Sequence, residues 1–334
     1  MTQIALAPME GLADAMLRDL LTAHGGIDWC VTEFVRISDR LLPAAAVQRI
    51  APELKQGSQT AAGTELRVQL LGSDPVCMAE NAAQIAGLGA AAIDLNFGCP
   101  AKTVNRPRGG AVLLREPETL HHIVAAVRAA LPAEVPVTAK MRLGYSDTSQ
   151  ALECAQALAA AGAAEIAVHA RTREQGYTPP ADWDWLARIR EAVSVPVVPN
   201  GDVTGLDSYR RIADISGCDQ VMIGRGLVAC PDLALRIQQS REGQVEQMMS
   251  WAALQPWLAD FYIQVRAQVA ADRHVPGRLK QWLVLLGNSY PEARALFDGI
   301  RRETCAQVLQ DMLLCPVPAQ PAPWPASTTS LLSC

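Results

Sequence analysis

The sequence lacks any run of about 18 apolar residues, the length that a membrane-spanning helix requires. Its first residues, MTQIALAPMEG, show neither the basic start nor the long apolar stretch of a secretory signal peptide. Half of its 334 residues are nevertheless hydrophobic, enough for a large globular core. We therefore expect a cytoplasmic protein that contacts no membrane.

Metal-binding cysteine patterns are also missing. The chain has nine cysteines, but none forms a C-x-x-C pair and none lies beside a histidine cluster. Zinc sites need such clusters, so we expect no metal. An odd, scattered set of cysteines is typical of a reducing compartment, which again favours the cytoplasm.

Lysine is scarce, and the formal net charge is −5. Taken alone, this charge counts against a nucleic-acid partner, although whole-chain charge does not describe local patches. A codon bias toward arginine would explain the scarcity of lysine, but each lysine is then worth examining. The four are Lys55, Lys102, Lys140 and Lys280.

Short apolar stretches alternate with amphipathic helical stretches between residue 3 and about residue 238. This alternation predicts a parallel sheet covered by helices, and eight units of about 25–30 residues match a (β/α)8 TIM barrel. A doubly wound open sheet is the alternative, but no G-x-G-x-x-G follows the first strand. The predicted strands cover residues 3–8, 30–34, 66–72, 91–98, 136–144, 165–171, 196–202 and 220–226.

The strand pattern stops near residue 240. Residues 1–240 are predicted to form the barrel, and the helical patterns over residues 241–315 predict a small C-terminal helical domain. Residues 316–334 are rich in Pro, Ala and Ser, which predicts a disordered tail.

Polar residues stand at the carboxyl ends of almost all predicted strands, where TIM barrels keep their active sites. Burying such groups without partners costs on the order of 1–3 kcal/mol each, so the set predicts a polar ligand. The residues at these strand ends, polar and apolar together, are Ala7, Pro8, Met9, Glu33, Gln69, Asn96, Cys99, Lys140, Arg142, His169, Arg171, Asn200, Gly201, Asp202, Gly224 and Arg225.

Two glycine turns, PNGDV after the seventh strand and IGRGL after the eighth, each lead into a helix. Such turns commonly bind phosphate in barrels, and Arg225 would add a charge-assisted contact; glycine that merely permits a tight turn is the alternative. Lys140 could be a paired lysine, a Schiff-base lysine or a cation beside a flavin ring. Gln69 could pair with the polar edge of such a ring. Cys99 could be a buried structural cysteine or a reactive group at a strand end.

Seven motifs together resemble the tRNA-dihydrouridine synthases. They occur in family order and at family spacing through the whole barrel, and the similarity continues into the helical region. Within the family, CVTEFVRISDRLLP and GRLKQWL resemble the bacterial subfamily that acts on uridine 16. The seven motifs are APMEG at 7–11, RVQLLG at 67–72, DLNFGCP at 94–100, AKMRLG at 139–144, VHARTREQGY at 168–177, PNGD at 199–202 and MIGRG at 222–226.

This resemblance implies an enzyme that reduces uridine in tRNA with FMN as cofactor and NADPH or NADH as reductant. Reduced flavin would give hydride to C6 of the uracil, and Cys99 would donate the proton to C5. A thiol with a pKa near 8.5 is mostly protonated at pH 7, as this role requires. The FMN-binding residues that it implies are Ala7, Pro8, Met9, Gln69, Lys140, His169, Asn200, Gly201, Asp202, Gly224 and Arg225.

The resemblance also implies a tRNA partner whose target base is drawn out of its stack into the barrel. The loop after Cys99 departs from the family pattern, with RPRGG replacing a more glycine-rich stretch, and there Lys102, Arg106 and Arg108 would meet phosphates. We expect a monomer. The residues implied to contact the tRNA or its target base are Arg36, Asn96, Arg171, Tyr177, Arg278, Lys280 and Arg301.

Three other functions remain open on the residues alone. An FMN-dependent reductase of a small pyrimidine or enone would need neither the helical domain nor the arginines near Tyr177. An aldolase using Lys140 would leave Gln69 and Cys99 unexplained. A tRNA-binding protein without catalysis would need neither Cys99 nor the two phosphate turns.

Overall fold

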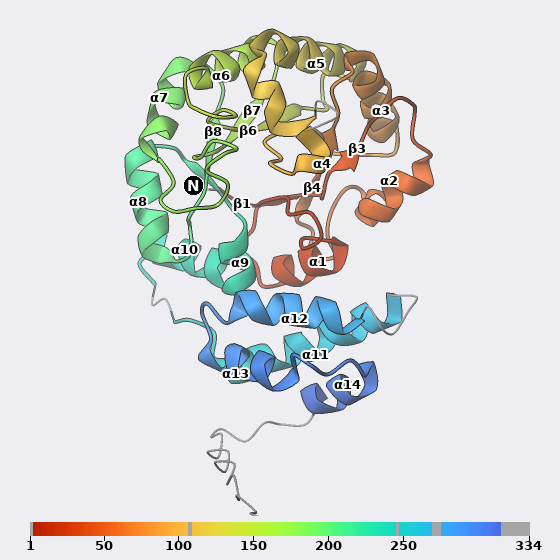
Figure 1. Cartoon of the computed structure of the whole chain (residues 1–334), viewed down its shortest axis with the longest axis vertical. Helices are drawn as coiled ribbons and strands as arrows, with labels where there is room; N and C mark the ends of the chain where they lie inside the picture. Colours follow the sequence, from red (N-terminus) through yellow and green to blue (C-terminus); the bar gives the residue numbers. More distant parts are fainter. Residues whose placement is uncertain (1–2, 106–108, 245–246, 269–274, 315–334) are drawn as a thin grey trace, which may run out of the picture.

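The computed structural model describes residues 3–105, 109–244, 247–268 and 275–314, so the predicted tail over residues 316–334 lies outside the described residues. Its strands form one closed parallel barrel, because β2 pairs with both β1 and β4 while the other strands follow in chain order. The short β3 follows β2 at the second strand position of the barrel and pairs with the end of β4. The predicted (β/α)8 TIM barrel is therefore confirmed (Figure 1). The strands are β1 (Gln3–Leu6), β2 (Trp29–Val31), β3 (Val35–Arg36), β4 (Glu65–Leu71), β5 (Ala92–Phe97), β6 (Val137–Arg142), β7 (Glu165–His169), β8 (Val197–Asn200) and β9 (Gln220–Ile223).

Helices surround the barrel in a ring (Figure 1). Two of them, α1 and α3, begin at an aspartate whose carboxylate caps the first turn: Asp14 accepts from the N–H of Leu17 at 3.0 Å, and Asp74 from that of Cys77 at 2.7 Å. The ring and its short connecting helices comprise α1 (Ala15–Ala23), α2 (Ala44–Ile50), η1 (Pro52–Gln56), α3 (Pro75–Gly87), α4 (Lys102–Asn105), η2 (Gly110–Arg115), α5 (Pro117–Ala130), α6 (Ala151–Ala160), α7 (Asp184–Ala192), α8 (Leu206–Ser216), α9 (Arg225–Ala229) and α10 (Leu233–Arg241).

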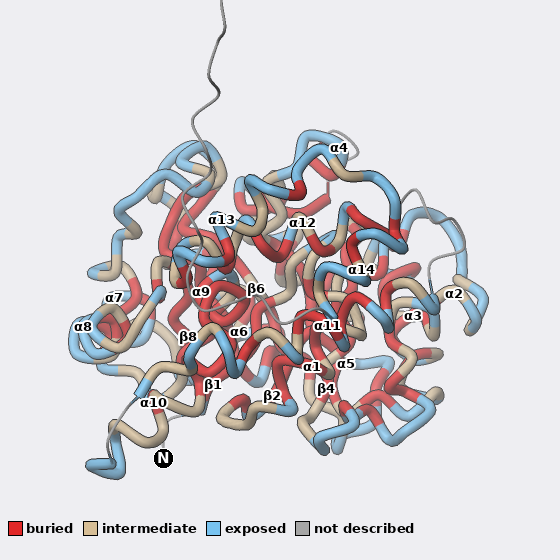
Figure 2. Tube along the Cα trace, turned by 90° about the horizontal axis from the view of Figure 1, so that it is seen from below, coloured by how far each residue is buried: buried red, intermediate tan, exposed pale blue. Residues whose placement is uncertain are grey.

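Strand alternation divides the apolar core into two parts. Ile4 and Leu6 face outward into the core beneath the helices, whereas Ala5 and Ala7 belong to a small separate cluster inside the barrel. Figure 2 shows the buried strands in red, with exposed outer turns, such as those of α8, in pale blue. Toward the carboxyl ends of β4 to β8, the inward positions become polar, which places the buried polar groups at one end of the barrel.

Four further helices pack below the barrel, next to α1 and α9 (Figure 1). The Trp282 indole is buried and donates to the carbonyl of Val228 at 3.0 Å, and its ring meets Phe261 edge-to-face at 4.9 Å. Burying aromatic surface of this size is a large stabilising contribution. Among the described helices, none is both long and apolar enough to cross a membrane. These four are α11 (Trp251–Gln268), α12 (Val275–Leu286), α13 (Pro291–Ile300) and α14 (Ala306–Leu314).

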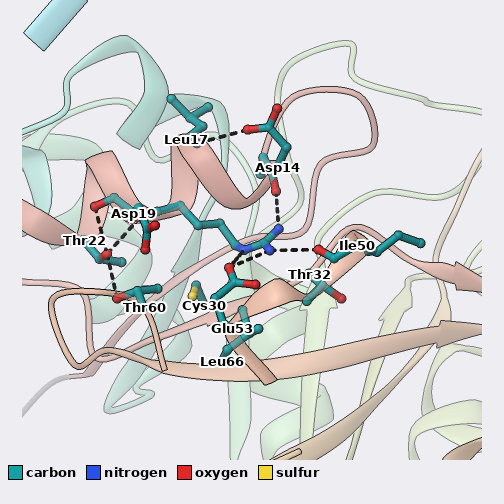
Figure 3. A network of polar contacts seen from close by, with 12 residues as sticks. Asp14, Leu17, Asp19, Thr22, Cys30, Thr32, Ile50, Glu53, Thr60 and Leu66 are labelled. Carbon is teal, nitrogen blue, oxygen red and sulfur yellow. Dashed lines mark hydrogen bonds and ion pairs between the residues drawn. The ribbon is translucent and has the colours of Figure 1, made fainter. Parts of the chain in front are cut away.

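A buried ion pair joins α1 to η1 on the outside of the barrel (Figure 3). The Arg18 side chain is 0 % exposed, and its Nε donates to Glu53 Oε1 at 2.8 Å. Its two terminal nitrogens donate to the carbonyls of Ala13 at 2.8 Å and Ile50 at 3.0 Å. The guanidinium is thus bound on every side by protein groups, a closed arrangement that holds three chain segments together.

Candidate active site

A cavity of about 1030 Å³ opens at the carboxyl ends of the barrel strands. Its size fits a bound cofactor together with part of a substrate. Helix α12 and the turn after it contribute Gln281, Leu285, Asn288 and Ser289 to the wall, so the C-terminal helices help to form it. The predicted site residues that line it are Ala7, Pro8, Met9, Gln69, Asn96, Cys99, Lys140, His169, Arg171, Tyr177, Asn200, Gly201, Asp202, Gly224 and Arg225.

Cys99 sits half-buried in this wall, on the loop that leaves β5. Its peptide N–H donates to Asn96 Oδ1 at 2.9 Å, and its carbonyl accepts from the N–H of Ala111 at 3.1 Å and from Asn105 Nδ2 at 2.9 Å. Gly110 has a φ of +65°, and a Cβ there would lie 2.9 Å from the Cys99 carbonyl. The backbone that carries the thiol is therefore held from both sides, and Gly110 is required at its position.

Burial raises the pKa of the Cys99 thiol, an effect that the N–H of Ala101 and the charge of Arg142 only partly offset. At neutral pH the group is a thiol rather than a thiolate. Such a side chain can give a proton to a ligand in the cavity but is a weak nucleophile.

Two carboxamides line the neighbouring wall. Asn96 Nδ2 donates to Gln69 Oε1 at 2.7 Å, and Gln69 Nε2 donates to Asp94 Oδ2 at 2.7 Å. Asp94 is buried, and its other oxygen accepts from the hydroxyl of Thr138 at 2.6 Å. Neither Asp94 nor Thr138 was predicted from the sequence, although both stand two residues before a predicted site residue and so share its side of the strand.

Lys140 contributes an ammonium group to the cavity. Its Nζ donates to Asn200 Oδ1 at 3.2 Å, and Asn200 Nδ2 donates to the carbonyl of Met222 at 2.8 Å. Burial, reinforced by the charge of Arg142, lowers the pKa of Lys140 to about 8. The lysine is still mostly protonated at pH 7, but an anionic ligand would hold its proton more firmly.

His169 and Arg171 form a second polar wall. Arg171 Nη1 lies 3.3 Å from His169 Nε2, and because arginine can only donate, this nitrogen is the acceptor and Nδ1 carries the proton. Burial and the charges of Arg142, Lys140, Arg171 and Arg225 lower the pKa of His169 far below its usual range. The imidazole is therefore neutral. It can donate to a ligand only through Nδ1.

Arg171 is only 1 % exposed and is bonded within the protein. Its Nη2 forms an ion pair with Asp202, and its Nε donates to the carbonyl of Thr178 at 2.7 Å. Asp202 has a φ of +58°, a left-handed conformation that few residues adopt without local support. The structure thus shows Arg171 holding the turn after β8.

Tyr177 stands at the mouth of the cavity and is 53 % exposed. The guanidinium of Arg142 lies 5.3 Å from its ring centre and that of Arg225 lies 4.7 Å from it. The sequence placed Arg142 at a strand end but predicted no role for it. Arg142 Nε donates to the carbonyl of Gly98 at 2.8 Å, which links this cation to the Cys99 loop. Cation–π contacts of this kind keep the tyrosine ring across the opening.

The two glycine turns approach each other closely. A Cβ at Gly226 would lie 2.1 Å from the carbonyl of Val203, and one at Gly224 would lie 3.2 Å from the sulfur of Met9. Gly201 has a φ of +124°, and a Cβ there would lie 3.0 Å from the His169 ring. These positions exclude side chains, which leaves backbone groups and the exposed Arg225 facing the cavity.

Four predicted tRNA contacts lie outside the cavity wall. Arg36 and Arg301 are exposed. Arg278 forms an ion pair with Asp14 at 2.6 Å and donates to the carbonyl of Gly11 at 2.7 Å, which ties α12 to the barrel. Lys280 Nζ donates to two carbonyls beyond the end of α13, those of Arg301 at 3.0 Å and Glu303 at 2.6 Å. Lys102 is exposed at the start of α4, whereas Arg106 and Arg108 lie outside the described residues.

The site fits a cofactor with a flat polar ring and a phosphate. The carboxamides and Lys140 offer hydrogen-bond donors on one side, and the glycine turns with Arg225 offer space and positive charge on the other. Within the described residues, no group of three or more His, Cys, Asp or Glu side chains is arranged to hold a metal.

Comparison with known proteins gives one consistent result. The family model described as "Dihydrouridine synthase (Dus)" matches residues 5–283. The chain is 60 % identical over 315 residues to a tRNA-dihydrouridine(16) synthase of Aquipseudomonas alcaligenes, covering 94 % of this chain and 100 % of that protein. It is 49 % identical over 300 residues to the protein of that name from Neisseria meningitidis serogroup A, covering 90 % of each.

Solved structures share the fold at low sequence identity. Histamine dehydrogenase from Rhizobium sp. 4-9 superposes with a TM-score of 0.56 at 15 % identity, over 78 % of this chain and 48 % of that one. A 2-naphthoyl-CoA reductase superposes with a TM-score of 0.55 at 13 % identity, over 75 % of this chain and 51 % of that one. The chain thus spans about half the length of these proteins, and the likeness shows the barrel fold.

Proposed function

The chain belongs to the dihydrouridine synthase family, and we propose that it reduces the C5=C6 bond of uridine 16 in tRNA to 5,6-dihydrouridine, with FMN as cofactor and NADPH as reductant. The position follows the names of relatives that are 47–60 % identical across most of the chain. The observation that carries the chemistry is the half-buried Cys99 thiol, which shares one cavity with donor groups suited to a flavin and a uracil.

The residues that line the cavity favour one orientation of FMN. Its ring would lie against the strand end at Ala7 to Met9, with Gln69 and Lys140 at its polar edge. Its phosphate would face the turns at Gly201 and Gly224, where Arg225 is exposed. His169 and Asn200 would lie between the two ends. When bound, FMN supplies the hydride that adds to C6 of the uracil.

Cys99 supplies the proton. As C6 gains hydride, C5 takes the proton from Sγ, and a thiolate remains. The raised pKa keeps the thiol protonated before the step, and the Ala101 N–H and the Arg142 charge stabilise the thiolate afterwards. A proton from solvent then restores the thiol. The fixed backbone on both sides of Cys99 keeps Sγ on one face of the base.

Asn96 meets the target base. Its side chain lines the cavity two strand positions beyond Asp94 and can donate a hydrogen bond to O4 of the uracil. Negative charge grows on that oxygen as C6 gains hydride, so the donor becomes more favourable in the transition state.

The tRNA body would rest on exposed cations outside the cavity wall, namely Arg36, Lys102 and Arg301, with Tyr177 meeting the extruded nucleotide. The internal bonds of Arg171, Arg278 and Lys280 suit a different contribution, which is to shape the surface that the tRNA meets. Residues 241–315 would then act as the tRNA-recognition domain.

Position-resolved mapping of dihydrouridine tests the proposal. Unmodified tRNA is treated with the purified protein, FMN and NADPH, and the reduced bases are located. Reduction at uridine 16 alone is expected. Reduction at another position would keep the chemistry and refute the assignment to uridine 16. A protein that oxidises NADPH without changing tRNA would instead be a small-molecule reductase.

A further inference from the structure

Four side chains form a continuous hydrogen-bonded chain beneath the cavity, from Thr138 on β6 through Asp94 on β5 and Gln69 on β4 to Asn96 on β5. Its links measure 2.6 Å, 2.7 Å and 2.7 Å. It ends at Asn96 Oδ1, which accepts the peptide N–H groups of Gly98 at 3.0 Å and Cys99 at 2.9 Å. We name this set, with its backbone end, the amide relay.

The backbone end fixes the direction of the relay. A peptide N–H can only donate, so the oxygen of Asn96 must face Gly98 and Cys99, and its NH₂ must face Gln69. The oxygen of Gln69 must therefore face Asn96, which turns its own NH₂ toward position 94. Only a group that accepts at this point completes the relay without an unpaired buried donor, and a carboxylate accepts with both oxygens.

With this orientation, the carboxamides present mainly hydrogen-bond donors to the cavity. Asn96 Oδ1 already accepts two bonds, so its free hydrogen-bonding group is the second N–H of Nδ2. Gln69 likewise has a second N–H, although its side chain is 0 % exposed, and both residues line the cavity beside the ammonium of Lys140. A wall of donors matches a ring edge that carries carbonyl oxygens, such as those of uracil and of the flavin.

From this geometry we infer that Asp94 is a positioning residue, which orients the Gln69 and Asn96 carboxamides so that the site selects carbonyl-bearing ring edges. The inference rests on the proposed function for the identity of the two rings. Its structural content, the dependence of two amide orientations on one buried acceptor, can be measured without tRNA.

A purely electrostatic role for Asp94 is the competing explanation. Burial raises its pKa, while Gln69, Thr138 and the charges of Arg67 and Lys140 lower it. If its charge mattered most, Asp94→Asn would be as harmful as any larger change. The relay predicts otherwise, because the oxygen of the introduced carboxamide could still accept from Gln69 while its NH₂ donates to the Thr138 hydroxyl, which can reverse its role.

The decisive experiment is a double-mutant cycle at positions 94 and 138, read by FMN titration of the apoprotein. Asp94→Asn and Thr138→Val are each expected to weaken FMN binding by less than about threefold, because each leaves the Gln69 acceptor in place. Together they leave the NH₂ of the introduced carboxamide without a partner, so nothing holds its oxygen toward Gln69, and binding is expected to fall more than about thirtyfold, well beyond the product of the two single effects. A double variant no worse than the product of the singles overturns the inference.

A second pair of variants decides the case if the double variant does not fold. Gln69→Glu places two carboxylates face to face and breaks the relay, whereas Gln69→Glu with Asp94→Asn restores a donor to each oxygen of the glutamate. The readout is the rate of Cys99 alkylation by iodoacetamide, followed by mass spectrometry. We expect faster alkylation in the single variant and a return toward the wild-type rate in the double.

If the alkylation rate of the double variant does not return toward the wild-type rate, the inference is wrong. Neither readout uses tRNA turnover, so a failure of the proposed function, seen as absent dihydrouridine with the wild-type protein, is distinct from a failure of the relay. Thermal unfolding of each variant accompanies both measurements and identifies any variant that does not fold.

Discussion

Two buried arginine networks in this protein differ in how their charge is balanced. On the outside of the barrel, Arg18 forms a closed network in the sense that its guanidinium meets one carboxylate and two carbonyls, although Oε2 of Glu53 is buried without a hydrogen-bond partner in the part of the chain that the structure describes (Figure 3). At the mouth, the cavity wall carries four cationic side chains and only two carboxylates, Glu10 and Asp202. Protein groups balance the charge of Arg18 and bind its guanidinium, whereas the second network keeps an excess of positive charge facing a space of about 1030 Å³.

The difference separates stability from function. A closed buried pair contributes to the fold only while both partners remain, because removing one leaves an unpaired charge. An excess of like charge in a cavity is unfavourable in the free protein, and the pKa of Lys140 shows this: burial lowers it first, and the charge of Arg142 lowers it further. An anionic ligand relieves that repulsion, so the cavity gains most from a phosphate and an electron-rich ring.

The comparison is tested most strongly by Cys99→Ala, the change with the largest expected effect. It removes the proton donor but no charge and no relay bond, so dihydrouridine formation should fall about 10²- to 10⁴-fold while FMN affinity stays near wild type. Turnover is measured with tRNA and NADPH, and FMN binding by fluorescence quenching. Cys305→Ala, at an exposed cysteine far along the chain, is the control. Turnover near the wild-type rate would remove Cys99 from the proposed role.

Arg18→Met should break the closed network. It leaves Glu53 buried without its partner, and the free energy of unfolding should fall by about 3–5 kcal/mol. The measurement is urea denaturation, with FMN affinity of the folded protein expected to remain unchanged. Glu53→Gln in the Arg18→Met background is the matched control, because it removes the stranded charge and should recover part of the loss. A decrease of less than about 1 kcal/mol in the free energy of unfolding would contradict a stabilising role for the Arg18–Glu53 pair.

Lys140→Met should have the opposite effect in the cavity, where positive charge is in excess: it should change ligand binding rather than stability. Removing one cation relieves repulsion, so stability should not fall, whereas FMN affinity should weaken about tenfold through loss of a charge-assisted contact. Thermal unfolding and FMN titration measure the two effects. A large loss of stability without a loss of FMN affinity would show that Lys140 belongs to a closed network after all.

The dependence of protein stability on pH gives a second test of Lys140. The folded-state pKa of about 8 lies below the value of about 10.4 in an unfolded chain, so the folded state releases this proton first as the pH rises. Between pH 8 and 10 the unfolded chain binds more protons, and wild-type stability should therefore rise relative to Lys140→Met. FMN affinity of the wild type should fall across the same window. Identical pH profiles for the two proteins would contradict the prediction.

Much of this site could be predicted from sequence because the carboxyl ends of the strands can be located from the apolar pattern. The period of two and the order of the strands place Gln69, Lys140 and His169 on the inward side at the carboxyl ends, and all three line the cavity described above. Family resemblance then supplied the chemistry that residue types alone left open.

What sequence did not predict depends on contacts between distant segments. The resemblance implies that Arg278 and Lys280 contact tRNA, which stays a prediction, but it does not indicate that their nitrogens meet Asp14 and the carbonyls after α13. Asp94 was overlooked because an acidic residue within an apolar strand shows its purpose only when its partners on β4 and β6 are known. Periodicity gives the side of a strand, but it does not give the partner.

The smallest expected effects come from Arg301→Ala and Lys280→Ala, which together test where the tRNA surface ends. Arg301 is exposed, so its loss should weaken tRNA binding a few-fold and reduce the dependence of log Kd on log salt by about one. Lys280 binds carbonyls after α13, so its loss should lower the free energy of unfolding by about 1 kcal/mol with the salt dependence unchanged. Filter binding across a salt series and urea denaturation separate the two. If Lys280→Ala instead changes the salt slope as much as Arg301→Ala does, the Lys280 ammonium leaves the two carbonyls on tRNA binding and contacts a phosphate. The helical region would then offer more positive charge to tRNA than its contacts in the free protein indicate.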